Sequence, residues 1–173
     1  MVAIVLPPSV PVDGMLKVTM VTTFADPNVP KLTELAALSS IDITCYLTKD
    51  GSFKESFDQS TFVDARACTS EEWEQLGAIK RGLEDLVYVY QPQAAALAAD
   101  NAAFEKLVPG SKGYFVIRRA VAYQTANAVG QFVSVWGATL GGRAEVGDTS
   151  NSVFKMKQKT SPYFYAEKVA LVA

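Results

Sequence analysis

Apolar and polar residues alternate with a period of two along much of the chain, and this alternation predicts β-strands. In residues 41–48 every odd-numbered position is Ile, Cys or Leu, and these side chains would share one face of a strand. The other segments with this period are rich in β-branched and aromatic residues, as strands commonly are. They are residues 15–23, 61–67, 114–121, 132–140, 143–159 in pieces, and 163–172.

Residues 69–90 fit two structures. Thr69 and Glu72 have the spacing of a helix capping box, and apolar residues follow at helical intervals. However, Gly77 and Gly82 would each destabilise a helix interior by about 1 kcal/mol. Alternation also runs unbroken from residue 79 to residue 89. We therefore predict two strands that are joined near Gly77, with a helix as the alternative.

Helical spacing is strongest in residues 93–108. The stripe consists of Ala94, Leu97, Phe104 and Val108, followed by the stop signal Pro109-Gly110. This face is narrow, so the helix should pack flat on a sheet. A second, short helix is expected after Pro30, with Leu32, Leu35 and Leu38 on one side, ending at Ser39-Ser40. About seven to nine strands with one substantial helix predict a mainly β fold, a sandwich or barrel with a helix on one flank.

Two segments depart from these patterns. Residues 1–14 contain three prolines and no period, so they predict an extended arm before a single domain of residues 15–173. Either the apolar residues of the arm become ordered when the arm binds a neighbouring subunit, or the arm is a flexible terminus without a partner. Residues 48–60 are polar with an Asp50-Gly51 turn signal, and they predict a long loop or a hairpin tip.

Composition excludes several classes of function. The 173 residues suit one domain, and a net charge of -2 lacks the basic footprint of a nucleic-acid-binding protein. There is no histidine, which removes the commonest general base and most zinc sites. No phosphate-binding glycine motif is present, and the glycines of residues 137–142 indicate a bend within a β-region. We expect no enzyme activity, no cofactor, no metal and no membrane span. Cys45 and Cys68 are far apart and fit buried or partly buried reduced thiols.

Several segments occur in an order and spacing that resemble the major tail tube protein family of long-tailed bacteriophages, the siphovirus type, particularly of actinobacterial hosts. They are Val29–Leu35, Ile41–Leu47, Asp64–Arg66, Trp73–Gly77, Leu83–Gln91 and Gly113–Arg119. The resemblance implies two packed antiparallel sheets with a flanking α-helix. It also implies hexameric rings that stack into a tube around the DNA path. Many relatives carry a C-terminal immunoglobulin-like decoration domain, which we expect to be absent here because the last strand ends near residue 173.

This resemblance implies a structural virion protein whose main partner is a further copy of itself. The other expected partners are further tail proteins, the enclosed tape measure protein, and passing DNA that is bound without sequence specificity. The chain would be synthesised in the host cytoplasm and reside in the phage tail, for genome ejection. Alternatives are the tube of a contractile tail or of a secretion apparatus, or a β-barrel that binds a small ligand.

Three groups of residues are candidate assembly contacts. In the 48–60 loop, Phe53 and Phe57 are expected to be exposed, although they are costly to leave in water, so this loop either contacts another subunit or is simply solvated. Three lysines at period two would lie on one face of a strand. This face is either solvated and protects a sheet edge, or it contacts carboxylates of a neighbouring subunit, such as those of residues 71–85. The apolar arm is the third. The candidates are Asp50, Gly51, Phe53, Lys54, Glu55 and Phe57; Lys155, Lys157 and Lys159; and Val2, Ile4 and Leu6.

Overall fold

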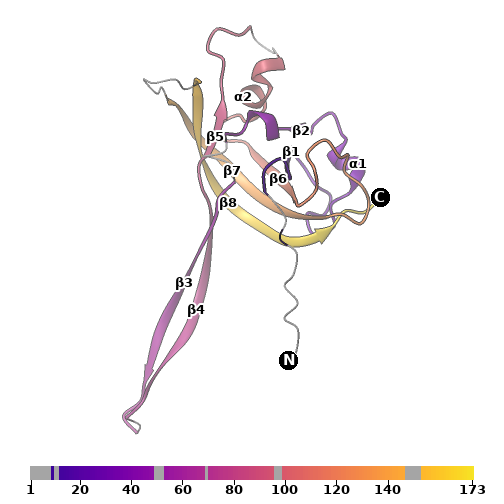
Figure 1. The fold of residues 1–173 in the computed structure, drawn as a ribbon. Helices are drawn as coiled ribbons and strands as arrows, with labels where there is room; N and C mark the ends of the chain where they lie inside the picture. Colours follow the sequence, from indigo (N-terminus) through magenta and orange to yellow (C-terminus); the bar gives the residue numbers. More distant parts are fainter. Residues whose placement is uncertain (1–8, 10–11, 49–52, 69, 96–98, 147–152) are drawn as a thin grey trace, which may run out of the picture.

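The fold consists of one six-stranded antiparallel sheet and one long two-stranded hairpin (Figure 1). The computed structural model describes residues 9, 12–48, 53–68, 70–95, 99–146 and 153–173. The mainly β class with two antiparallel sheets and few helices is thus confirmed. The elements in chain order are β1 (Leu16–Val21), α1 (Leu32–Leu35), β2 (Ile41–Asp42), the 3-10 turn η1 (Thr44–Tyr46), β3 (Glu55–Ala65), β4 (Glu72–Leu83), β5 (Leu86–Val89), the 3-10 turn η2 (Ala99–Asn101), α2 (Ala102–Lys106), β6 (Lys112–Arg119), β7 (Phe132–Val146) and β8 (Lys155–Ala170).

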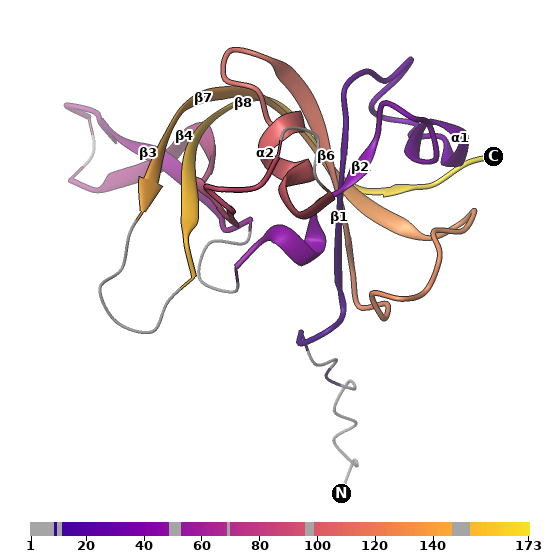
Figure 2. The ribbon, with the colours of Figure 1, turned by 90° about the horizontal axis from the view of Figure 1, so that it is seen from above.

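The large sheet has the strand order β2-β1-β6-β7-β8-β5, and β7 and β8 form its longest pair. These two strands arch over α2 when the molecule is viewed from above (Figure 2). Register shifts between Gly137 and Ala138 and between Leu140 and Arg143 locate the bend, because an extra residue in one strand increases its local twist. The bend expected in residues 137–142 is therefore confirmed. At Gly137 an added Cβ would lie 2.8 Å from the Tyr163 ring, so the two strands approach closely there.

The main core fills the concave face of the sheet. Trp136 and Tyr88 are its largest aromatic side chains, and Ala103 and Leu107, in and just after α2, close it from the open side. Helix α2 therefore packs on the sheet, as expected. The predicted stripe is wrong, however, because the buried residues are Ala103 and Leu107, whereas Val108 is 50% exposed. A smaller core on the opposite face contains Val116, Val135 and Leu171.

A buried arginine organises the loop between β6 and β7. The Arg118 guanidinium is 2% exposed and donates five hydrogen bonds into this loop. Burial lowers the pKa of Arg118, and the charge of Asp42 opposes that effect. Its acceptors are the carbonyl oxygens of Ala122, Thr125 and Ala126 and the side-chain oxygens of Asn127 and Gln131, at 2.8–3.3 Å.

Two predicted elements are shorter than expected. The strand predicted over residues 41–48 ends at Asp42, because the Asp42 carboxylate accepts hydrogen bonds from the Thr44 amide and hydroxyl and turns the chain into η1. As a result Ile43 is buried and Cys45 is exposed, so they do not share a face. Among the described residues of the helix predicted over 93–108, helical backbone occurs only in residues 99–106, of which only α2 is α-helical. Before it, the Asn101 amide bonds both backbone groups of Gln91 and holds that segment out of the helix.

The segment 69–90 forms strands, so the helical alternative is wrong. The interruption lies at Glu84 and Asp85 and not at Gly77, which lies inside β4 against Ser60 of β3. Residues 48–60 are not all loop either, since β3 begins at Glu55.

The short helix and the cysteines also differ from expectation. Helix α1 is a single turn that buries Leu35, whereas Leu38 is 99% exposed beyond its end. Cys45 and Cys68 are free and exposed, so the expected burial of their thiols is wrong.

Candidate assembly surfaces

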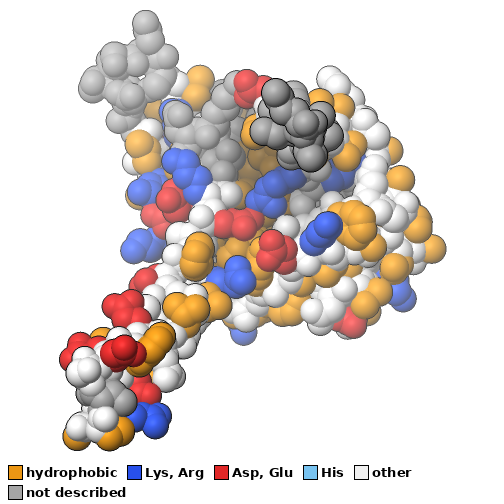
Figure 3. Space-filling model, turned by 60° about the horizontal axis from the view of Figure 1, so that its bottom comes forward, with side chains coloured by type: hydrophobic (Ala, Val, Ile, Leu, Met, Phe, Trp, Pro, Cys, Tyr) orange, Lys and Arg blue, Asp and Glu red, His pale blue; other side chains and the backbone are white. Residues whose placement is uncertain are grey.

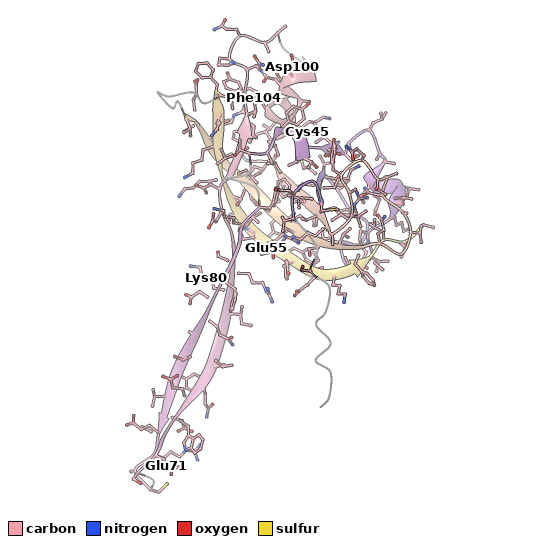
Figure 4. All side chains as sticks on the ribbon, in the orientation of Figure 1. Cys45, Glu55, Glu71, Lys80, Asp100 and Phe104 are labelled. Carbon is pink, nitrogen blue, oxygen red and sulfur yellow. The ribbon has the colours of Figure 1, made fainter. Side chains whose placement is uncertain are left out.

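The β3–β4 hairpin projects from the sheet (Figures 1 and 4), and among the described residues only its base contacts the rest of the chain. Figure 4 shows Glu55 at the base, Lys80 along the hairpin and Glu71 at its far end. Eleven residues of β3 span about 35 Å at the usual rise of a strand. The hairpin is therefore long enough to reach well beyond its own subunit.

The base of the hairpin is fixed by packing and by charge. Phe53 and Leu83 are each 6% exposed, and the Phe53 ring lies 5.0 Å from the Phe115 ring in the main core. Glu55 forms an ion pair with Arg119 of β6. The Thr160 hydroxyl of β8 donates to the carbonyl oxygen of Leu83 at 3.1 Å. These contacts set the angle at which the hairpin leaves the sheet.

An aromatic hollow of about 270 Å³ lies where the hairpin base meets β8. The Arg81 guanidinium lies 4.5 Å from the centre of the Tyr165 ring. Burial raises the pKa of Tyr163 to about 12, with a further contribution from its hydrogen bond with Tyr114. Burial also raises the pKa of Tyr165, and the charges of Glu55 and Glu167 add to this effect. The phenols are therefore protonated at neutral pH, and they offer surface and hydrogen bonds but no nucleophile.

Beyond its base, the hairpin exposes large apolar side chains on both faces. Residues that are directly opposite in an antiparallel pair share a face. One face carries Val63, opposite Glu74, and Leu76, opposite Thr61. The other carries Phe62 and Trp73. Leu76 is 71% exposed and Trp73 is 65% exposed. Figure 3 shows hydrophobic and acidic side chains mingled along this projection. Exposed apolar surface of this extent, rimmed by charge, is typical of a protein interaction site.

The carboxylates of the distal hairpin differ in their partners. Asp64 accepts two hydrogen bonds from the side chain of Arg66 and one from Gln75. Within the part of the chain that the structure describes, Glu72 and Glu74 are exposed and form no ion pair. Both lie on the same face as Val63 and Leu76. We call this group, Val63, Glu72, Glu74 and Leu76, the acidic hairpin face.

A basic surface lies at the beginning of β8. Met156 and Gln158 are buried, while the three lysines that alternate with them point to the opposite, outer face. Lys157 forms a 3.4 Å ion pair with Asp85, and it remains 54% exposed. The cross-strand neighbours on this face are the half-buried valines Val87 and Val89 of β5 and the exposed Ala144 and Val146 of β7. We call this group the lysine strip; it consists of Lys155, Lys157, Lys159, Val87, Val89 and Val146.

The structure places the candidate residues from the sequence in different environments. Val2, Ile4, Leu6, Asp50 and Gly51 lie outside the described residues. Phe53 is a buried anchor, and Glu55 is paired with Arg119; the expectation that Phe53 is exposed is wrong, because its ring turns into the core beside Phe115. The Lys54 carbonyl oxygen accepts a hydrogen bond from the Glu84 amide at the hairpin base, and its side chain is exposed. Phe57 is 71% exposed on the hairpin. The three lysines share one face, as the period predicts. Whether any of these residues contacts another subunit stays a prediction.

Sequence reasoning missed the apolar residues of the distal hairpin as a surface. Trp73 and Leu76 are three residues apart, which is a helical interval, so the sequence did not indicate one exposed apolar side chain on each face of a strand. The available signal was the density of carboxylates around them in residues 71–74.

The described residues contain neither a candidate metal site nor a candidate membrane-spanning helix. No cluster of three or more potential ligands, counting Cys, Asp and Glu, could hold a metal ion there. None of the helices there has the length and apolar character needed to cross a membrane.

The sequence model of a family described as phage tail tube protein matches residues 5–173, which is nearly the whole chain. No curated protein matches the chain.

Proposed function

The chain belongs to the phage tail tube protein family, and from this premise we propose that copies of it form hexameric rings, which stack into the tube that conducts DNA into the host. The coarser role follows from the family itself: the protein is a structural component of the phage tail, and its place is in the virion. The segments that resemble siphovirus-type proteins support a long-tailed phage of an actinobacterial host.

The projecting hairpin is the observation that carries the assembly part of this proposal. A two-stranded hairpin is at best marginally stable in water unless it packs on something else. Here the distal part packs on nothing within its own chain among the described residues, and it exposes Leu76 and Trp73. Further copies of the protein would cover these side chains and both hairpin edges, as a closed ring or stack requires.

The charge of the chain suits a passage for DNA. A net charge of -2 per subunit lets many copies gather without strong repulsion. It also avoids the dense phosphate contacts that would hold DNA in place. In this proposal the tube encloses the tape measure protein and later the DNA, neither bound through a specific site, and other tail proteins bind its ends. Such a role needs neither catalytic residues nor a cofactor.

A shortened hairpin tests the proposal. Gln59 and Ile79 are directly opposite in the register, so an Asn-Gly turn can replace residues 60–78 while the anchored base is kept. We expect the unaltered protein to form tubes of six-subunit rings in electron micrographs. The shortened variant should stay folded and monomeric by light scattering. Tubes of normal length from the shortened variant, or an unaltered protein that remains monomeric at all concentrations, would contradict the proposal.

A further inference from the structure

We propose that the acidic hairpin face of one subunit docks on the lysine strip of a second copy, in a head-to-tail contact that repeats along the tube. This inference rests on the proposed self-assembly and adds the identity of two surfaces that meet. Both surfaces lie within the described residues, and each combines apolar side chains with charges of one sign.

Charge complementarity is the first support. The acidic hairpin face presents Glu72 and Glu74, for which the described residues provide no ion-pair partner. The lysine strip presents Lys155 and Lys159, which likewise form no ion pair among the described residues. Opposed potentials of this kind set the register of an interface and disfavour wrong partners.

Matched spacing is the second support. Glu72 and Glu74 are two residues apart on β4, and the lysines are two residues apart on β8. Side chains at this separation on one face of a strand are about 7 Å apart. Strand laid against strand would therefore bring the two carboxylates opposite the half-exposed Lys157 and one of its two unpaired neighbours, Lys155 or Lys159. Leu76 and Val63 would meet the valines beside the lysines, so that apolar surface is covered on both partners.

The placement of the two surfaces requires that the partner be another molecule. Figure 1 shows the hairpin extending away from the end of β8 that lies beside β5 and carries the lysines. A subunit therefore cannot fold its own hairpin onto its own lysine strip. A copy displaced along the direction of the hairpin can receive it, and because the two surfaces differ, the contact is head-to-tail and can repeat along the tube.

Charge exchange tests the inference. One variant carries Glu72→Lys and Glu74→Lys, and another carries Lys155→Glu and Lys159→Glu, which leaves the Lys157–Asp85 pair intact. For each variant the critical concentration for polymerisation is measured by pelleting. We expect each variant to raise it at least tenfold, and more so at low salt, because repulsion between exposed charges is then less screened. The variant with all four substitutions should return to within about threefold of the unaltered protein.

A matched control separates pairing from net charge. Asp100→Lys with Glu105→Lys changes the net charge as much as the hairpin variant does. These residues lie at α2, whose end bonds Gln158 on the inner face of the sheet, away from the lysine strip. Combined with Lys155→Glu and Lys159→Glu, this control should not restore assembly. Equal restoration by the control, or none by the four-substitution variant, overturns the inference while tubes of the unaltered protein still support the proposed function. Absence of tubes from the unaltered protein overturns both.

Discussion

Replacement of Arg118 by Met should destabilise the subunit by about 3 kcal/mol. Met keeps an unbranched apolar stem but removes all five hydrogen bonds that the guanidinium donates to the β6–β7 loop. A hydrogen bond to a charged group contributes about 1.5–3 kcal/mol. Thr125 and Ala126 are exposed, so their carbonyl oxygens can bind water after the substitution. Three acceptors remain, those of Ala122, Asn127 and Gln131, and all three residues are half-buried. Because water can partly replace the guanidinium there, we expect each to lose about 1 kcal/mol, the usual net contribution of a hydrogen bond.

The neighbouring residue provides the control. Arg119 is on the exposed side of β6, and its ion pair with Glu55 is partly open to solvent. Arg119→Met should therefore cost no more than about 1 kcal/mol. Urea unfolding followed by circular dichroism, below the concentration at which the protein assembles, gives both values. Hydrogen exchange should also accelerate at residues 121–131 in the Arg118 variant. A cost below about 1 kcal/mol for Arg118→Met, or equal costs for the two variants, would refute the role assigned to the buried guanidinium.

Two further predictions concern the close approach of β7 and β8. Gly137→Ala places a Cβ 2.8 Å from the Tyr163 ring and 2.9 Å from Phe164, so thermal unfolding should show that stability falls by about 1–3 kcal/mol. Gly142→Ala is the control and should lower stability less, because nothing lies within 4 Å of the added Cβ. The raised pKa of Tyr163, about 12 in the folded protein against about 10 unfolded, means that folding favours the protonated phenol. That contribution to stability is complete below pH 10 and is lost as the pH rises from 10 to 12. The midpoint of urea unfolding should therefore fall over this pH range, and it should fall less steeply in Tyr163→Phe.

The predictions from sequence succeeded where alternation reflects burial on one face. Strands β1, β6 and β7 were predicted close to their observed positions, because their alternating side chains pack into two cores. The strand predicted over residues 41–48 was too long. The alternation of apolar and polar residues does not show that the Asp42 carboxylate can accept hydrogen bonds from Thr44 and so end the strand.

The candidate surface was harder to predict than the fold. Phe53 and Phe57 look alike in a polar segment, yet one is 6% and the other 71% exposed. Their difference depends on where the hairpin leaves the sheet, which is decided by contacts with Phe115 and Arg119 far along the chain. Similarly, the alternation in β4 could be recognised in the sequence. The sequence did not indicate that, beyond the hairpin base, both faces of β4 would be left uncovered by the described residues.

The hairpin projects from one end of the subunit only, and this gives any stack that uses it a polarity. One terminus of such a stack presents bare hairpins, while the other presents vacant receiving surfaces. The two termini therefore cannot be closed by the same protein. The two termini need not grow at equal rates. At one terminus an incoming subunit has to order its own hairpin, and at the other it receives a hairpin of the stack on its free surface. A tube of this kind would have a built-in front and back before any other tail component binds.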